Sequence, residues 1–206
     1  MKNPTEFKNI IFDFGGVLMD LDVSRSKAAF QRLVADGFNI PKSFGADFFL
    51  NFELGKIPAS DFRDSLRKVL GDHRLSDHSI DQAWNAMLGG IPEDRLALLE
   101  DLKKTRRIFL LSNTNRIHHD CFAATMAGVS GSAAEFENLF EGVYYSYKMG
   151  LRKPNPEIFN AVIAQHSLRC EDTLFVDDSL ENVEAARGVG LGGYHLQGQL
   201  LEAGLI

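Results

Sequence analysis

Four short apolar runs, each ending at polar residues or at a glycine-containing loop, constrain the fold of this chain more than any other feature. They lie at 9–14, 107–112, 142–146 and 173–176. Continuous apolar runs of this length indicate strands buried on both faces, as in a parallel sheet. Helical patterns separate the later runs, at 92–104, 156–164 and 179–187. This alternation predicts an α/β protein with a doubly wound sheet, which binds ligands at the carboxyl ends of its strands.

Residues 23–90 interrupt the alternation of strands and helices. This segment has helical periodicity at 25–35, 60–70 and 76–88, with Gly and Pro between, and no convincing strand. We interpret it as a helical cap inserted after the first strand, which divides the chain into a core of 1–20 and 91–206 and a cap of 21–90. We expect aromatic side chains to form the inner face of this cap, namely Phe44, Phe48, Phe49 and Phe52.

Two smaller features complete the predicted organisation. Residues 126–137 are rich in Gly, Ser and Ala, which predicts a surface loop or a short helix. Ser112 and Asn113 follow an apolar run and precede a helical pattern, so they are also candidates for capping that helix.

Composition and charge exclude several classes of protein. The 206 residues carry a formal charge of -6, which argues against nucleic acid as a partner. Cys121 and Cys170 are far apart and have no C-x-x-C spacing, so neither a disulfide framework nor a zinc site is indicated. No apolar run approaches the roughly 18 residues of a membrane span, and the polar N-terminus does not resemble a signal peptide. We therefore expect a cytoplasmic protein without membrane contact; the oligomeric state stays open.

The polar residues at the ends of the apolar runs form four motifs. They read Phe12-Asp13-Phe-Gly-Gly-Val-Leu, Leu111-Ser112-Asn113-Thr-Asn, Gly150-Leu-Arg-Lys153-Pro-Asn-Pro and Phe175-Val-Asp177-Asp178-Ser-Leu-Glu-Asn. In this order they resemble the motifs of the haloacid dehalogenase-like hydrolase superfamily, over nearly the whole chain. The residues of these motifs are most similar to those of the branch of sugar-phosphate phosphatases that includes α-glucose-1-phosphate phosphatase. The resemblance implies a Rossmann-like core with a C1-type helical cap.

The resemblance also implies a role for each motif. Asp13 would be the nucleophile that forms an aspartyl-phosphate, which water then hydrolyses. Ser112 and the amide of Asn113 would bind phosphate oxygens, and the charge of Lys153 would bind phosphate and orient Asp13. A further set would hold Mg²⁺ with hard oxygen ligands: Asp13, the backbone carbonyl of Gly15, and Asp178 with Asp177 beside it. Which of Asp177 and Asp178 contacts the metal directly stays open.

One position departs from the pattern of most phosphatases in this superfamily. They carry a second Asp two residues after the nucleophile as general acid, whereas this chain has Gly15. Such a loss costs on the order of 10²–10⁴ in rate. The leaving group could be a good one, such as an anomeric hydroxyl, or Asp20 or Asp22 could replace the acid. Alternatively, the protein could bind phosphate esters without turning them over.

Together these features predict a Mg²⁺-dependent phosphatase of small phosphorylated metabolites, and of sugar phosphates in particular. The alternatives are a catalytically weak protein that binds phosphate esters, and a haloacid dehalogenase, which also lacks the second Asp. Dehalogenases substitute at carbon without a metal, so the paired acids Asp177 and Asp178 favour phosphate chemistry.

Overall fold

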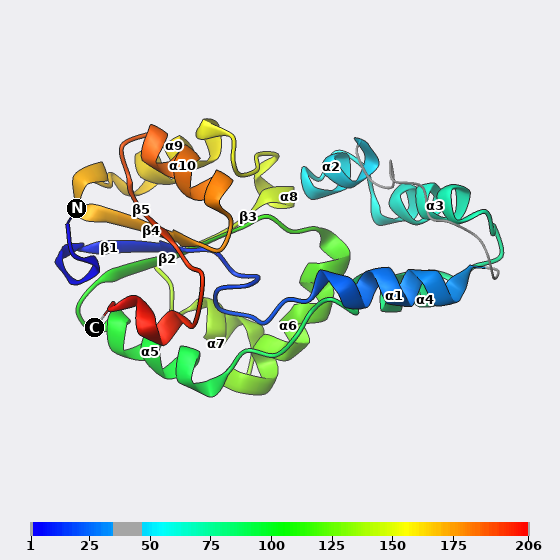
Figure 1. Ribbon diagram of the computed structural model, residues 1–206, viewed down its shortest axis with the longest axis horizontal. Helices are drawn as coiled ribbons and strands as arrows, with labels where there is room; N and C mark the ends of the chain where they lie inside the picture. Colours follow the sequence, from blue (N-terminus) through cyan, green and yellow to red (C-terminus); the bar gives the residue numbers. More distant parts are fainter. Residues whose placement is uncertain (1, 35–46, 206) are drawn as a thin grey trace.

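The computed structural model describes residues 2–34 and 47–205, which form a sheet core with a lobe of helices at one end (Figure 1). The core is a five-stranded, fully parallel sheet with the strand order β3-β2-β1-β4-β5. Its strands are β1 (Asn9–Phe12), β2 (Arg107–Ser112), β3 (Gly142–Tyr145), β4 (Thr173–Asp177) and β5 (Gly192–His195). The predicted α/β fold with a parallel, Rossmann-like sheet is confirmed.

The central strand, β1, explains why the apolar runs are continuous. Ile10, Ile11 and Phe12 are fully buried, because β1 has a strand on each side and helices on both faces. In register, Phe12 lies opposite Leu110 of β2 and Val176 of β4. The carboxyl ends of these three strands therefore lie side by side.

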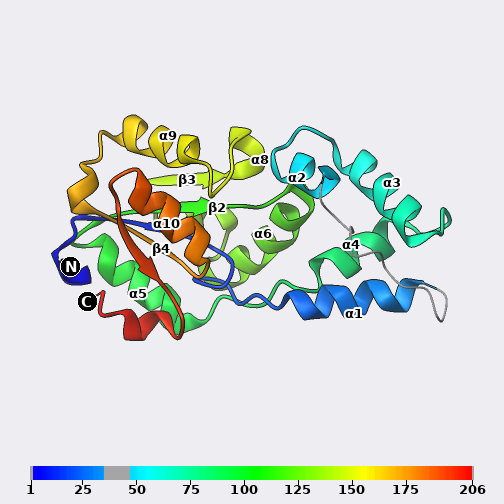
Figure 2. The same cartoon turned by 45° about the horizontal axis from the view of Figure 1, so that its top comes forward.

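Helices cover the two faces of the sheet (Figures 1 and 2). One hydrophobic cluster packs α5 (Glu93–Lys103), α6 (Arg116–Ser130) and α7 (Ala133–Glu137) against the first face. A second cluster packs α9 (Pro156–His166) and α10 (Leu180–Gly188) against the other. Short segments complete the core, namely the helix α8 (Ser146–Met149) and the 3₁₀ turns Pro4–Glu6, Cys170–Asp172 and Leu200–Ala203.

The helical lobe lies beyond the carboxyl ends of the strands (Figure 1). We use this name for α1 (Val23–Leu33), α2 (Asp47–Glu53), α3 (Ala59–Leu70) and α4 (Asp77–Asn85). These helices share a third hydrophobic cluster, which includes Phe30, Phe62 and Leu66 and also Ile117 from α6 of the core. The lobe therefore has its own apolar interior, which also packs against α6 of the core.

The predicted aromatic cap face is partly tested. Phe52 is buried in the lobe cluster, and Phe48 and Phe49 pack against it and lie within 5.7 Å of the Phe62 ring, centroid to centroid. Phe44 lies outside the described residues. The short helix α2, which carries three of these rings, was not anticipated by the periodicity.

Two antiparallel connecting segments join the lobe to the core. Asp20 N–H donates to Gly90 O at 2.9 Å, and Gly89 N–H donates to Asp20 O at 2.8 Å. Next along the segments, Leu21 and Leu88 form a bridge. The lobe thus leaves and re-enters the core through one short, paired stem.

The structure decides two local alternatives. Residues 126–137 are helical apart from the turn at Gly131 and Ser132, as the end of α6 and as α7, so the short-helix alternative holds. The cap of α6 is Asn115, whose side chain accepts from His118 N–H, and not Ser112 or Asn113. Within the described part of the chain, no helix has both the length and the apolar character needed to cross a bilayer.

Candidate active site

The sheet topology brings the first, second and fourth motifs to one edge. Asp13 follows β1 and donates its backbone N–H to Val176 O of β4 at 2.9 Å. Ser112 ends β2 and Asp177 ends β4, the two neighbours of β1. All three side chains are buried, with exposed fractions of 8%, 3% and 0%. Buried polar groups at strand ends are the positions at which sheets of this kind bind ligands.

Lys153 joins this group from the loop before α9. Its Nζ donates to Asp13 Oδ1 at 2.5 Å and to Asp177 Oδ2 at 2.7 Å, and its side chain is 1% exposed. Burial acts to lower the pKa of Lys153, but the two carboxylates raise it above its usual value. Burial also raises the pKa of Asp13 to about 7, against the opposing effect of Lys153. The lysine thus stays charged and fixes the Asp13 carboxylate.

Asn113 fixes the loop that carries Lys153. Its side-chain Nδ2 donates to Lys153 O at 2.8 Å, and its Oδ1 accepts from Lys153 N–H at 2.9 Å. The second motif therefore holds the third in place by two hydrogen bonds. The side chain of Asn113 thus holds the lysine loop, whereas its backbone amide is the group expected to bind phosphate.

The two acids of the fourth motif have different surroundings. Asp177 Oδ1 accepts from Ser179 N–H at 2.8 Å, and both of its oxygens lie 3.1 Å from Asn182 Nδ2. With Lys153 as well, the buried Asp177 has a full set of donors. Asp178 is exposed and faces Gly16, where an added Cβ would lie 2.8 Å from Asp178 Cγ. Gly16 has φ +83°, so both its backbone and the space beside it require glycine.

Asp13, Asp177 and Asp178 form the group of acids suited to a metal ion among the described residues. Each offers a carboxylate oxygen, and these oxygens lie within 4.8 Å of one another. Burial, and then the charge of Asp177, raise the pKa of Asp178. A divalent cation would relieve this repulsion, and three carboxylates are the hard oxygen donors that magnesium prefers. The residues present therefore fit Mg²⁺.

Comparison with known proteins agrees with this geometry. Residues 7–190 match the haloacid dehalogenase-like hydrolase family. The chain belongs to this family. The resemblance expected from the four motifs is thus confirmed.

Relatives within the haloacid dehalogenase-like family include characterised phosphatases. The chain is 32% identical to a D-ribitol-5-phosphate phosphatase of Bacteroides thetaiotaomicron, over 89% of this chain and 88% of the relative. It is 30% identical to a sesquiterpene phosphatase of Aspergillus oryzae, over 95% and 93%. A solved family enzyme of B. thetaiotaomicron, in complex with magnesium and inorganic phosphate, is 38% identical and superposes with a TM-score of 0.82, over 91% of this chain and 93% of that one.

The structure gives Asp20 and Asp22 partners other than the site. Asp20 pairs with Arg95 of α5 at 2.9 Å, and Asp22 caps α1 by accepting from Ser24 N–H at 3.0 Å. Neither contact directs a carboxylate towards Asp13. These contacts give no support to the alternative that Asp20 or Asp22 replaces the acid missing at Gly15.

Sequence reasoning missed several residues around the site. Asn182 lies five residues after Asp177, in the first turn of α10, and this spacing after a strand was the available signal. Glu53 of the lobe pairs with Arg152, which directly precedes Lys153, at 3.1 Å. No pattern in the sequence could have joined these two, because they lie far apart along the chain.

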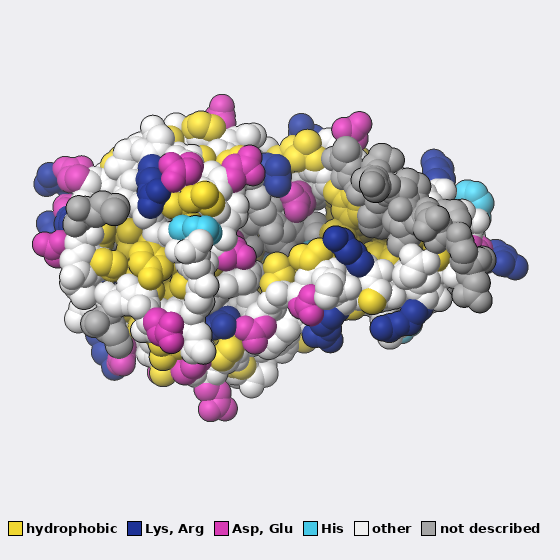
Figure 3. Space-filling model, viewed as in Figure 1, with side chains coloured by type: hydrophobic (Ala, Val, Ile, Leu, Met, Phe, Trp, Pro, Cys, Tyr) yellow, Lys and Arg dark blue, Asp and Glu magenta, His cyan; other side chains and the backbone are white. Residues whose placement is uncertain are grey.

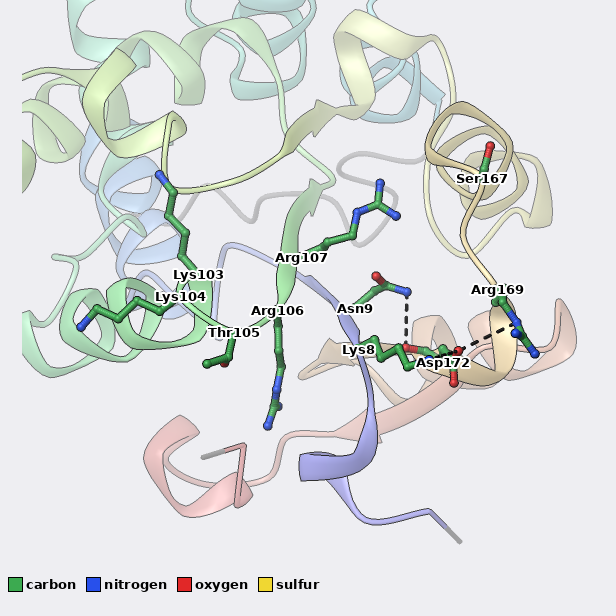
Figure 4. Close-up of a pocket in the computed structure, with 10 residues that line it drawn as sticks. All are labelled: Lys8, Asn9, Lys103, Lys104, Thr105, Arg106, Arg107, Ser167, Arg169 and Asp172. Carbon is green, nitrogen blue, oxygen red and sulfur yellow. Dashed lines mark hydrogen bonds and ion pairs between the residues drawn. The ribbon is translucent and has the colours of Figure 1, made fainter.

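Other hollows of the molecule lie away from these carboxylates. One of about 590 Å³ is lined by basic residues at the amino ends of β1 and β2, the opposite end of the sheet from Asp13. Its side chains point apart: Lys103 and Lys104 extend to one side and Arg169 to the other (Figure 4). Between the sheet core and the helical lobe the surface is also hollowed (Figure 3). Asp13, Ser112 and Asp177 lie at the carboxyl ends of β1, β2 and β4, the end of the sheet that faces the helical lobe (Figure 1).

Proposed function

We propose that this chain is a Mg²⁺-dependent phosphatase of small phosphorylated metabolites, with sugar and polyol phosphates as its substrates. The observation that carries the proposal is the buried arrangement of Asp13, Lys153 and Asp177 beside Asp178. The phosphatases among its relatives support a phosphoric monoester hydrolase, and the relative named for ribitol 5-phosphate supports the substrate class. We propose that the helical lobe acts as the cap over this site, with the division at 20/21 and 90/91.

Each site residue receives a role from its contacts. The Asp13 carboxylate attacks phosphorus, the ester P–O bond breaks, and water then hydrolyses the resulting acyl phosphate. Lys153 orients Asp13 and supplies positive charge to the phosphoryl oxygens. Ser112 and the backbone amide of Asn113 bind those oxygens, while the Asn113 side chain keeps Lys153 in place. Asp177 also holds Lys153, by accepting a hydrogen bond from its Nζ.

Magnesium is the cofactor for which this site is suited, and it supplies charge stabilisation to the transferring phosphoryl group. We propose Asp13, Asp178 and the carbonyl of Gly15 as its ligands. Because Lys153, Ser179 and Asn182 already occupy the oxygens of Asp177, we assign Asp178 as the direct ligand of the pair and Asp177 as the residue that positions the lysine.

The missing acid at Gly15 bears on which esters react fastest. An anomeric hydroxyl leaves with less need for protonation than an ordinary alcohol, so sugar 1-phosphates suit this site. The paired acids argue against the dehalogenase alternative. Soluble cytoplasmic location and the absence of a nucleic-acid partner stay predictions from the sequence.

The test is phosphate release from a panel of esters, with Mg²⁺ and with a chelator. The panel contains glucose 1-phosphate, glucose 6-phosphate, ribitol 5-phosphate and an isoprenoid monophosphate. We expect release that requires Mg²⁺ and favours sugar or polyol phosphates. Fast release from the isoprenoid ester alone would overturn the substrate class. Binding of Mg²⁺ and phosphate without release from any ester would leave only the alternative of a phosphate-ester binder.

The role of Asp13 has its own test. Asp13→Asn keeps the shape of the side chain but removes the nucleophilic charge, so we expect turnover to fall by at least about 10³-fold. The fold is checked by circular dichroism and urea unfolding. Activity near the wild-type level in a folded Asp13→Asn variant would contradict the proposed nucleophile.

A further inference from the structure

The helical lobe touches the core close to the third motif, at a place separate from its stem. The turn after α2 contains Gly55, with φ +65°, and a Cβ there would overlap the carbonyl oxygen of Tyr147 in α8. The two backbones therefore approach as closely as glycine permits. This contact places the end of α2 next to the loop that continues from α8 to Lys153.

An ion pair crosses the same seam. Glu53, the last residue of α2, lies 3.1 Å from Arg152 Nε through its Oε2, and both side chains are 30% exposed. Burial raises the pKa of Glu53, while Arg152 and then Lys153 act to lower it. The half-buried carboxylate thus depends on the guanidinium group for its charged form. Separation of lobe and core would break this pair and expose both groups to water.

Arg152 is coupled directly to the catalytic group. It precedes Lys153 in the chain, and Lys153 contacts both Asp13 and Asp177. On the core side, Asn113 holds the backbone of Lys153 by two hydrogen bonds. On the lobe side, Glu53 holds the neighbouring residue, so the lysine loop is fixed from both bodies of the protein.

We propose that Glu53 and Arg152 are positioning residues that make the lysine loop sensitive to the position of the helical lobe. With the lobe closed, the ion pair holds the loop so that Lys153 points at Asp13. With the lobe open for exchange of substrate and product, the pair is broken and the loop loses this restraint. The site is therefore complete only when the lobe covers it. This inference rests on the proposed phosphatase function.

The test is a double-mutant cycle in turnover of the best ester of the panel. We compare the wild type with Glu53→Gln, Arg152→Gln and the double variant. Each single variant should lower kcat on the order of 10-fold, because a misplacement of about 1 Å can cost about 10²-fold and a smaller displacement of Lys153 costs less. KM should change less than kcat, since Ser112 and the backbone amide of Asn113 keep their places at the end of β2. The double variant should be no slower than either single one, because the two side chains act through each other.

A matched control separates this role from the loss of any glutamate–arginine pair. Glu141 and Arg107 form a two-bonded ion pair at 2.7 Å and 2.6 Å, at the amino end of the sheet. Glu141→Gln should leave kcat unchanged. The proposal would be overturned if the double variant lost kcat by the product of the two single effects, or if both single variants kept the wild-type kcat.

A second readout does not depend on turnover. Trp84, the single tryptophan of the chain, belongs to α4 of the lobe and stacks on His118 of the core, with the ring centroids 4.6 Å apart. Loosening the lobe should increase acrylamide quenching of its fluorescence in both single variants and to the same extent in the double variant. If the wild type hydrolyses no ester, the proposed function fails. The role of the ion pair as a restraint on the lobe is refuted separately, by unchanged fluorescence quenching in these variants.

Discussion

At the scale of single residues, two glycines with positive φ differ in what surrounds them. A Cβ on Gly16 would meet the carboxylate of Asp178, whereas a Cβ on Gly150 would meet no atom within 4 Å. Their φ angles are +83° and +67°. Backbone strain from a side chain is therefore common to both, but displacement of a candidate metal ligand is specific to Gly16.

This difference gives a prediction. Gly16→Ala should raise the Mg²⁺ concentration for half-maximal activity on the order of 10-fold or more, because it moves Asp178 away. Gly150→Ala should lower the free energy of unfolding by about 1–2 kcal/mol through its φ alone, with an unchanged Mg²⁺ requirement. Titration of activity with Mg²⁺ and urea unfolding measure the two effects. An unchanged requirement in Gly16→Ala would remove Asp178 from the proposed ligand set.

At the scale of elements, a buried serine joins two helices of the lobe that are not consecutive in the chain. Ser26 of α1 is 3% exposed; its Oγ donates to Trp84 O at 2.8 Å and accepts from Met87 N–H at 3.0 Å. It thus ties α1 to the end of α4, where the lobe returns to the core. The helix positions depend on these long-range bonds as well as on the shared apolar cluster.

Ser26→Ala should therefore lower the free energy of unfolding by about 1–3 kcal/mol, because it removes one buried and one partly buried hydrogen bond to the backbone. Ser65→Ala is the control, since Ser65 makes a similar bond to Asp61 O at 2.8 Å, but in an exposed position. Urea unfolding monitored by circular dichroism compares the two variants. Equal losses in both would show that burial of the serine is not what matters.

At the scale of the whole molecule, the seam between lobe and core contains a buried histidine. His118 of α6 is 7% exposed and its Nδ1 lies 2.8 Å from Asn85 Oδ1 of α4. Burial lowers the pKa of His118 to about 3. Between pH 6.5 and 3 the unfolded chain therefore binds a proton that the folded chain does not, so stability falls as the pH falls.

We expect His118 to contribute up to about 1.4 kcal/mol per pH unit to the loss of unfolding free energy below pH 6.5. His118→Gln should remove this contribution and give a shallower dependence, measured by urea unfolding from pH 8 to 4. At pH 8 the histidine is neutral in both states, so the difference between variant and wild type there reports only the changed contacts. If the unfolding free energies of variant and wild type changed in parallel from pH 8 to 4, His118 would not be the source of this pH dependence.

The sequence by itself determined four of the five strands, all but β5, and the identity of the chemical groups. Apolar runs such as 9–14 and 173–176 become central strands because only a position covered on both faces favours continuous apolar side chains, and that rule is local. The four motifs were sufficient to place the chain in its family and to name Asp13 and Lys153 as candidates. Their roles stay proposals, but their proximity is a property of the fold.

Tertiary structure alone decided which groups meet. That Lys153 bridges Asp13 and Asp177, that Asn182 completes the partners of Asp177, and that Glu53 reaches Arg152 all depend on residues remote in the chain. Such contacts depend on the strand order and on the position of the lobe against the core, and neither can be predicted from the periodicity of apolar residues. The reason is physical: propensity and patterning act within a few residues, whereas a buried charge is fixed by whichever partner the whole fold brings to it.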